Sequence, residues 1–137
     1  MRKSTIIAEF KADKKSVWDV VTNNEDYGWR SDLSKIEVKE NGKQFIEYNK
    51  GGFATTFTIT KKEPYDCYAF DMENQNFHGH WKGLFSQTPE GGTKIEFTEE
   101  LEIPNKIMEI LSYGMMPLKK IQKTYIKDLK RKLGEEE

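Results

Sequence analysis

The sequence is poor in cysteine, histidine and proline, and it contains no long hydrophobic run. Its 137 residues include one cysteine, two histidines and four prolines. The single cysteine, Cys67, cannot form an internal disulfide bond, which is typical of proteins in a reducing compartment. No stretch is long and apolar enough to cross a membrane, and the first residues lack the apolar core of a signal peptide. We therefore expect a cytoplasmic protein without stable membrane insertion.

An excess of charge of one sign is also missing. The 22 basic and 23 acidic residues leave a net charge of −1, so no global basic field attracts nucleic acid, and no nucleic-acid partner is expected. Metal sites usually need three or four protein ligands, and two histidines, His78 and His80, are too few on their own. No glycine-rich phosphate loop or cysteine–histidine cluster is present. The sequence thus predicts neither a bound metal nor a cofactor.

Aromatic side chains supply much of the apolar surface of this chain. Only 36% of the residues are hydrophobic, but 12% of all residues are aromatic. Large rings can form the wall of a cavity as well as fill a core. The length of the chain suits one domain, so we expect a single domain over residues 1–137.

The hydrophobic periodicity predicts seven strands and three helices. Strands are expected at residues 4–10, 35–40, 43–49, 53–60, 67–72, 77–85 and 93–101, and helices at residues 13–23, 104–113 and from 117 onward. Short turns between the last six strands imply antiparallel hairpins. Asp13 suits the N-cap of the first helix, and Pro117 suits the start of the last one. That last helix is expected to cover the sheet with the apolar face Leu118, Ile121, Tyr125, Leu129 and Leu133.

Alternation in the strand at residues 77–85 separates two sets of side chains. Phe77, Gly79, Trp81, Gly83 and Phe85 share one face, and His78, His80, Lys82 and Leu84 share the other. A four-residue turn after Met72 pairs Phe70 with Gly79 and Tyr68 with Trp81, so that the two apolar sets meet on the inner face. Both histidines then point outward, with Asp71 opposite His78. Only a β-bulge would turn His80 inward as a catalytic group.

Two glycines interrupt the expected inner face. Gly79 and Gly83 place no side chain between Phe77, Trp81 and Phe85. This pattern has two interpretations. The sheet curves and leaves volume for a ligand, or neighbouring rings fill the gap.

The chain resembles the polyketide cyclase/dehydratase-like branch of the START-related superfamily (SRPBCC). The resemblance rests on the order of the elements, on "YGWRSDLSKIEV" at 27–38, "GHWKGLF" at 79–85 and "GGTKIEFTEEL" at 91–101, and on the closing helix, and it covers about residues 3–133. It implies an α+β helix-grip fold, in which a curved seven-stranded antiparallel sheet wraps around a long C-terminal helix and encloses a hydrophobic cavity. It implies no single activity, because members include lipid carriers, hormone receptors, polyketide cyclases, oxygenase domains and chaperone co-factors.

Acid–base chemistry in such a cavity would need an inward carboxylate. Glu99 shares the phase of Phe97 and is expected opposite Trp81, where burial would raise its pKa; alternatively, it lies at the rim in contact with solvent. Glu47 points inward with Phe45, or outward if the other phase of its strand is buried. Arg30 is placed to pair with an inward Glu47. Glu47, Glu99 and His80 are therefore the candidate catalytic residues.

The favoured function is binding or carriage of a small hydrophobic or amphipathic molecule, such as a lipid, a polyketide or an aromatic compound. The alternative is a cyclase or dehydratase that uses cavity carboxylates as general acid and base. Convergence of two or more ionisable side chains inside the cavity would favour the enzyme. We expect a monomer or a weak homodimer. The residues expected to contact the ligand are Trp29, Arg30, Phe57, Tyr68, Phe70, Gly79, Trp81, Gly83, Phe85, Phe97, Tyr113, Met116 and Tyr125.

Overall fold

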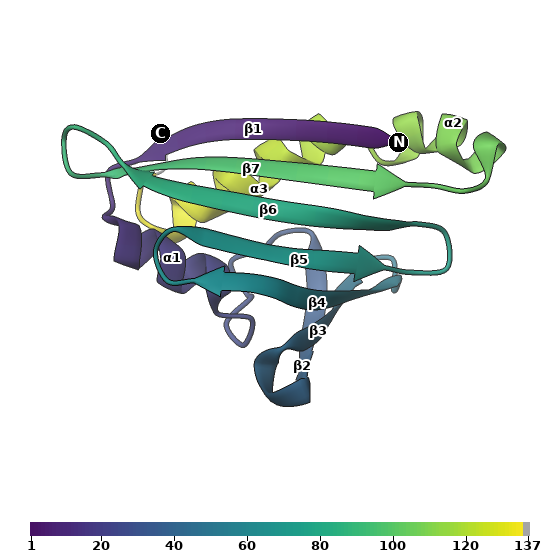
Figure 1. Cartoon of the computed structure of the whole chain (residues 1–137), viewed down its shortest axis with the longest axis horizontal. Helices are drawn as coiled ribbons and strands as arrows, with labels where there is room; N and C mark the ends of the chain where they lie inside the picture. Colours follow the sequence, from purple (N-terminus) through teal and green to yellow (C-terminus); the bar gives the residue numbers. More distant parts are fainter. Residues whose placement is uncertain (136–137) are drawn as a thin grey trace.

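The computed structural model describes residues 1–135, which form one antiparallel sheet with helices on one side (Figure 1). The strands are β1 (Arg2–Phe10), β2 (Leu33–Lys39), β3 (Gln44–Asn49), β4 (Ala54–Glu63), β5 (Cys67–Glu73), β6 (His78–Gln87) and β7 (Thr93–Glu102). The α-helices are α1 (Lys14–Thr22), α2 (Lys106–Met115) and α3 (Leu118–Lys132), and a short 3-10 helix, η1 (Glu40–Gly42), joins β2 to β3.

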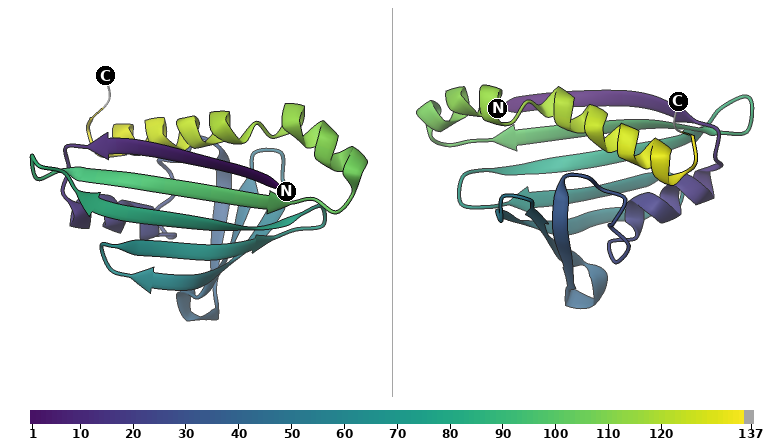
Figure 2. Two further views of the ribbon diagram at one scale, coloured as in Figure 1. Left: turned by 45° about the horizontal axis from the view of Figure 1, so that its top comes forward. Right: turned by 180° about the vertical axis from the view of Figure 1, so that it is seen from behind.

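The sheet order is β1-β7-β6-β5-β4-β3-β2, and every neighbouring pair is antiparallel. Strands β2 and β3 turn away from the direction of the others, so the sheet curves (Figure 1). Helix α3 lies lengthwise across the sheet near β1, and α2 extends beyond the end of β7 (Figure 2). This is the predicted α+β helix-grip architecture, with the long C-terminal helix held against the curved sheet.

Local sequence signals account for the ends of the helices. The Asp13 carboxylate accepts a hydrogen bond from the backbone N–H of Ser16 at 2.8 Å and caps α1, whose Val17, Trp18 and Val21 are buried. Helix α3 begins directly after Pro117, as expected.

The buried face of α3 differs from the predicted one. It contains Leu118, Gln122, Ile126 and Leu129, whereas Ile121 is 39% exposed. Gln122 tolerates burial because Ser4 satisfies its amide: the Ser4 hydroxyl donates to Gln122 Oε1 at 2.7 Å, and Gln122 Nε2 donates to the Ser4 carbonyl at 2.9 Å. An apolar pattern alone could not identify this polar member of the buried stripe.

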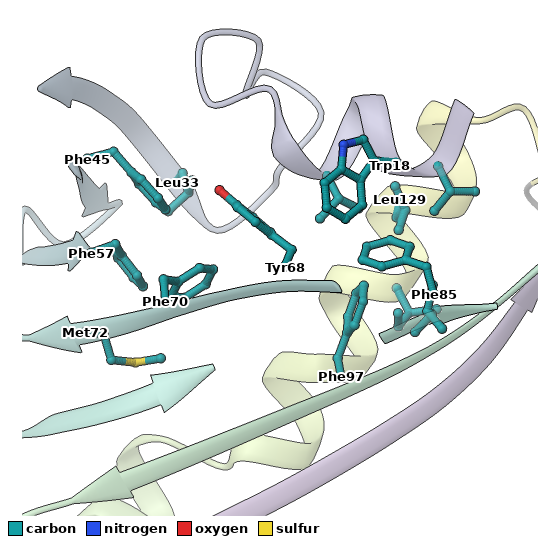
Figure 3. Packing of buried hydrophobic residues seen from close by; sticks show 14 of the residues in the cluster. Trp18, Leu33, Phe45, Phe57, Tyr68, Phe70, Met72, Phe85, Phe97 and Leu129 are labelled. Atoms are coloured by element: carbon teal, nitrogen blue, oxygen red, sulfur yellow. The ribbon is translucent and has the colours of Figure 1, made fainter. Parts of the chain in front are cut away.

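Aromatic rings form a large part of the core between the sheet and the helices (Figure 3). The Phe45 and Phe57 rings are stacked with centroids 4.9 Å apart, and Phe70 and Trp81 are stacked at 4.8 Å. The Phe70 ring also meets the Phe57 ring edge-on at 5.1 Å. Such offset and edge-to-face pairs add to the free energy gained from apolar burial.

The predicted register between β5 and β6 was wrong by two residues. Phe70 lies opposite Trp81, Met72 lies opposite Gly79, and Tyr68 lies opposite Gly83. The cause is the hairpin loop, where the Asn74 carboxamide oxygen accepts backbone N–H bonds from Asn76 and Phe77 and moves the first pair of the ladder to Glu73 and His78. A shift of two residues preserves the face of every side chain.

Both histidines lie on the outer face of the sheet. His80 Nδ1 contacts Asp71 Oδ1, and His78 Nε2 lies 3.3 Å from Glu102 Oε2. The pairing of β5 with β6 runs without a bulge from Cys67 to Glu73, so alternation holds and His80 does not reach the inner face. His80 is therefore withdrawn as a candidate catalytic residue.

Candidate functional site

A cavity of about 160 Å³ lies between the inner face of the sheet and α3. Its apolar wall contains Ile6, Val21, Phe45, Phe57, Phe70, Met72, Trp81, Phe97 and Ile121. Its polar wall contains Asn24, Arg30, Asp32, Glu47, Tyr68, Glu99, Gln122 and Tyr125. The lining includes partly exposed side chains, among them Ile121, so the cavity extends toward the protein surface.

Arg30 connects two carboxylates at one side of the cavity. Its Nε and Nη2 atoms donate to Asp32 at 3.0 and 2.9 Å, and its Nη1 atom lies 3.4 Å from Glu47 Oε2. Its guanidinium also lies over the Tyr125 ring, 4.9 Å from the centroid. Glu47 therefore takes the inward alternative, and the ion pair expected between Arg30 and Glu47 is present.

Burial perturbs the ionisation of both partners. It raises the pKa of Glu47 above its ordinary value, although the positive charge of Arg30 opposes this shift. Burial lowers the pKa of Arg30, but the negative charge of Glu47 and the hydrogen bonds to Asp32 outweigh burial and leave that pKa raised. The guanidinium is consequently a fixed positive charge that two carboxylates already share.

Glu99 is the isolated ionisable group of the cavity. It lies on β7 opposite Trp81, as the alternation predicted, and its side chain lines the cavity. Within residues 1–135, no side chain or backbone N–H donates a hydrogen bond to its carboxylate. Burial, reinforced by the negative charge of Glu47, raises its pKa to about 7. Glu99 thus lies on the inner face of the sheet, and its side chain remains partly accessible to solvent.

Two tyrosine hydroxyl groups complete the polar wall. The Tyr68 hydroxyl accepts a hydrogen bond from Asn24 Nδ2 at 3.2 Å, and it points into the space between the helices and the sheet (Figure 3). Burial raises the pKa of Tyr68 and also that of Tyr125, although Asn24 and Arg30 respectively oppose the shift. Both phenols therefore stay protonated at neutral pH and are available as hydrogen-bond donors.

Solved structures share this architecture at low sequence identity. The protein XoxI from Bacillus cereus is 14% identical, with a TM-score of 0.74 over 96% of this chain and 94% of that chain. A conserved protein from Geobacillus kaustophilus is 14% identical, with a TM-score of 0.72 over 97% and 95%. A START superfamily protein from Mycobacterium smegmatis is 11% identical, with a TM-score of 0.66 over 90% and 93%. This chain has the helix-grip fold of these structures. No family model and no curated protein matches the sequence.

Four residues expected to contact a ligand lie elsewhere in this helix-grip fold. Trp29 packs edge-on against the Tyr125 ring at 5.4 Å, outside the cavity lining. Phe85 is buried against Trp18 at 5.1 Å and belongs to the core. Tyr113 is 59% exposed on α2, and Met116 is half-buried against the core. Tyr113 and Met116 therefore do not line the cavity.

The two glycines do not create the empty volume of this helix-grip cavity. A Cβ atom at Gly83 would lie 2.7 Å from the Trp81 ring and 3.0 Å from the Phe97 ring. A Cβ atom at Gly79 would collide with the Glu100 carbonyl oxygen and lie 2.9 Å from Leu101 Cδ2. Neither glycine lines the cavity. Neighbouring rings occupy the gap at Gly83, as the second interpretation has it, whereas the β7 backbone and Leu101 occupy it at Gly79.

Sequence reasoning missed several lining residues, although two of them carried a signal. Phe45 has the same phase as Glu47 in β3, and Asp32 follows Arg30 by two positions. The placement of Ile6, Val21 and Asn24 depends on how α1 and β1 pack, which no local pattern gives. Within residues 1–135, no group of three or more metal-ligating side chains is close enough to hold a metal ion. None of the described helices has the length and apolarity needed to span a membrane.

Proposed function

We propose that this protein binds one compact molecule that combines an aromatic or similarly flat apolar group with a single hydrogen-bonding group. The observation that carries this proposal is the aromatic cavity in which the Glu99 carboxylate has no partner among the described residues. Binding sites for small molecules are mostly apolar, with a few polar groups that fix the orientation of the ligand.

The size of the cavity supports a ligand with about one ring. Its volume of about 160 Å³ is comparable to that of an engineered protein cavity, roughly 150 Å³, that binds benzene. Pockets for drug-sized ligands start at about 300 Å³. A single-ring compound therefore fits without rearrangement, whereas a long lipid chain or an extended polyketide exceeds the volume of the cavity.

The polar groups define how such a ligand lies. Phe70, Trp81 and Phe97 offer ring faces and edges to an apolar body. Glu99 is on the same face of the sheet, so a polar substituent on the ligand completes its missing hydrogen bond. A hydrogen bond to a buried polar group that otherwise lacks a partner contributes about 1–3 kcal/mol to the binding free energy.

Isothermal titration calorimetry with benzyl alcohol and benzylamine tests the proposal. Ligands with so few atoms bind weakly, and we expect at least one Kd on the order of 0.1–1 mM. The variant Ile121→Trp should weaken binding at least fivefold, because the larger side chain enters the cavity. The matched control is Ile7→Trp on the outer face of β1, where Ile7 is 55% exposed. Absence of saturable heat for both compounds would refute the proposal.

A second candidate function is proton transfer on a small carbonyl compound, and the convergence of Arg30, Glu47 and Glu99 in one cavity favours it. A carboxylate whose pKa is about 7 is equally able to accept and to donate a proton at neutral pH. In such a reaction Glu99 would remove a proton from the carbon next to the carbonyl, and the Tyr68 hydroxyl would donate a hydrogen bond to the enolate oxygen.

Deuterium exchange into acetophenone tests this second function without knowledge of the natural substrate. In D₂O, proton removal followed by deuteron return replaces the methyl hydrogens, and proton NMR follows their loss. Catalysed exchange that disappears in Glu99→Gln and persists in Glu100→Gln would support the enzyme. Exchange no faster than in buffer would leave binding as the function of the cavity.

A further inference from the structure

The charges that line the cavity do not balance. Asp32, Glu47 and Glu99 supply three carboxyl groups, and Arg30 supplies one positive charge. Arg30 already donates to Asp32 and lies within 3.4 Å of Glu47, so its charge is shared between these two. The lining therefore has an excess of negative charge at the unpartnered Glu99 when this group is ionised, and Arg2 on β1, which is outside the lining, offsets this excess in part.

Aromatic rings surround the same space. Trp81 lies directly opposite Glu99 in the β6–β7 register, stacks on Phe70 at 4.8 Å and lies 4.7 Å from Phe97. The faces of such rings carry partial negative charge and attract cations, most strongly where water is excluded. Aromatic rings and an unpartnered carboxylate thus favour the same kind of ligand.

From this arrangement we infer that the ligand is a small organic cation, an aromatic or other compact amine whose ammonium group lies against the Glu99 carboxylate. This inference rests on the proposed function and adds the charge of the ligand to it. A bound anion would face uncompensated carboxylates, because Arg30 has no free positive charge to offer. A neutral ligand would satisfy a hydrogen bond but leave the excess charge in place.

The pH dependence of binding follows from the groups that face Glu99. These groups are Arg2 on β1, Arg30 and Asp32 between α1 and β2, Glu47 on β3, Tyr68 on β5 and Tyr125 on α3. An ammonium group adds a positive charge that favours the ionised form of Glu99. Because the pKa of Glu99 is about 7 in the free protein, an amine binds about tenfold more weakly at pH 6 than at pH 8.

Three probes of one size test the charge of the ligand: benzylamine, benzyl alcohol and benzoate, titrated calorimetrically at pH 6 and pH 8. At pH 8 we expect benzylamine to bind about tenfold more tightly than benzyl alcohol, and benzoate to bind most weakly. In Glu99→Gln the advantage of benzylamine over benzyl alcohol should fall to threefold or less, and its pH dependence should vanish. Glu100→Gln, on the outer face of the same strand, should retain both.

The outcomes separate this inference from the proposed function. Benzyl alcohol or benzoate binding as tightly as benzylamine would overturn the cationic ligand and leave the binding function intact. A benzylamine advantage that survives in Glu99→Gln would also overturn it, because the ammonium would then lie elsewhere. Failure of all three probes to bind would overturn both.

Discussion

Replacing Glu99 with glutamine should stabilise the protein at pH 8 and have little effect at pH 5. Glutamine keeps the shape of the side chain and removes its charge. The pKa of Glu99 is about 7 in the folded protein, compared with an ordinary value of 4.5. The folded state therefore binds the proton more tightly than the unfolded state does.

The sign and the size of the effect follow from this difference. Glu99 contributes stability that is fully present below pH 4.5 and is lost as the pH rises through 7, because the unfolded chain ionises first. The full shift corresponds to about 3 kcal/mol, of which roughly 2.5 kcal/mol is lost between pH 5 and pH 8. The unfolding free energy of Glu99→Gln relative to wild type should therefore rise by about 2.5 kcal/mol between these two pH values.

Urea denaturation followed by circular dichroism at pH 5 and pH 8 measures this difference. Comparison of the two proteins cancels the titration of all other groups that the substitution leaves unchanged. The control is Glu100→Gln, whose carboxylate lies 3.8 Å from Lys3 Nζ on the outer face of the same strand. Its unfolding free energy relative to wild type should change by less than about 0.5 kcal/mol between pH 5 and pH 8. Equal behaviour of the two variants would mean that Glu99 is solvated, and the account of the cavity would then be wrong.

Three further predictions concern the outer face, the strand glycines and the ion pair. His80→Ala should leave the Kd for benzyl alcohol within twofold of wild type by calorimetry, and a tenfold loss would place His80 inside. Gly83→Ala should lower the unfolding free energy by about 1–3 kcal/mol in urea, because its Cβ would lie 2.7 Å from an aromatic ring. The control is Gly28→Ala, because a Cβ atom at Gly28 would have no atom within 4 Å. It should change the unfolding free energy by less than about 0.5 kcal/mol, and equal losses in the two variants would show that the space beside Gly83 is open. Arg30→Met should lower the free energy of unfolding by about 3 kcal/mol, because it leaves Glu47 without its positive partner. Adding Glu47→Gln should restore part of this loss, and no recovery would refute the ion pair.

Alternation was sufficient to predict the inner face of the central strands. The pairing of Trp81 with Glu99 and the outward position of His80 both follow from period two and from the short turns. The error in the β5–β6 register did not affect these assignments, because a shift of two residues leaves every side chain on the same face of the sheet. A one-residue error would have reversed every one of them.

The face of Glu47 could not be predicted, because it depends on the length of the loop after β3. Hydrogen bonds between Asn49 and Phe53 close that loop around residues 50–52, and the Asn49 side chain accepts from Gly51 and Phe53. This geometry places Phe45 and Glu47 on the inner face. A loop shorter by one residue would have given the opposite answer.

The location of empty volume was the least predictable feature. The sequence pattern allowed empty volume at Gly79 and Gly83, but the Trp81 ring lies close against Gly83 and the β7 backbone approaches Gly79. The true cavity depends on how the large rings and α3 pack against one another, which is a tertiary property.

The position of a bound ligand ring shows directly whether the cavity is the binding site. In the presence of benzyl alcohol or benzylamine, whichever binds more tightly, intermolecular NOEs from the ligand ring to protein methyl groups can be measured by NMR. A ring bound in the cavity should give NOEs to Ile6, Val21 and Met72, which line the cavity, and none to Ile7 or Leu84, which are exposed on the outer face. NOEs confined to exposed methyl groups would contradict binding in the cavity, because the ring would then lie on the surface of the protein.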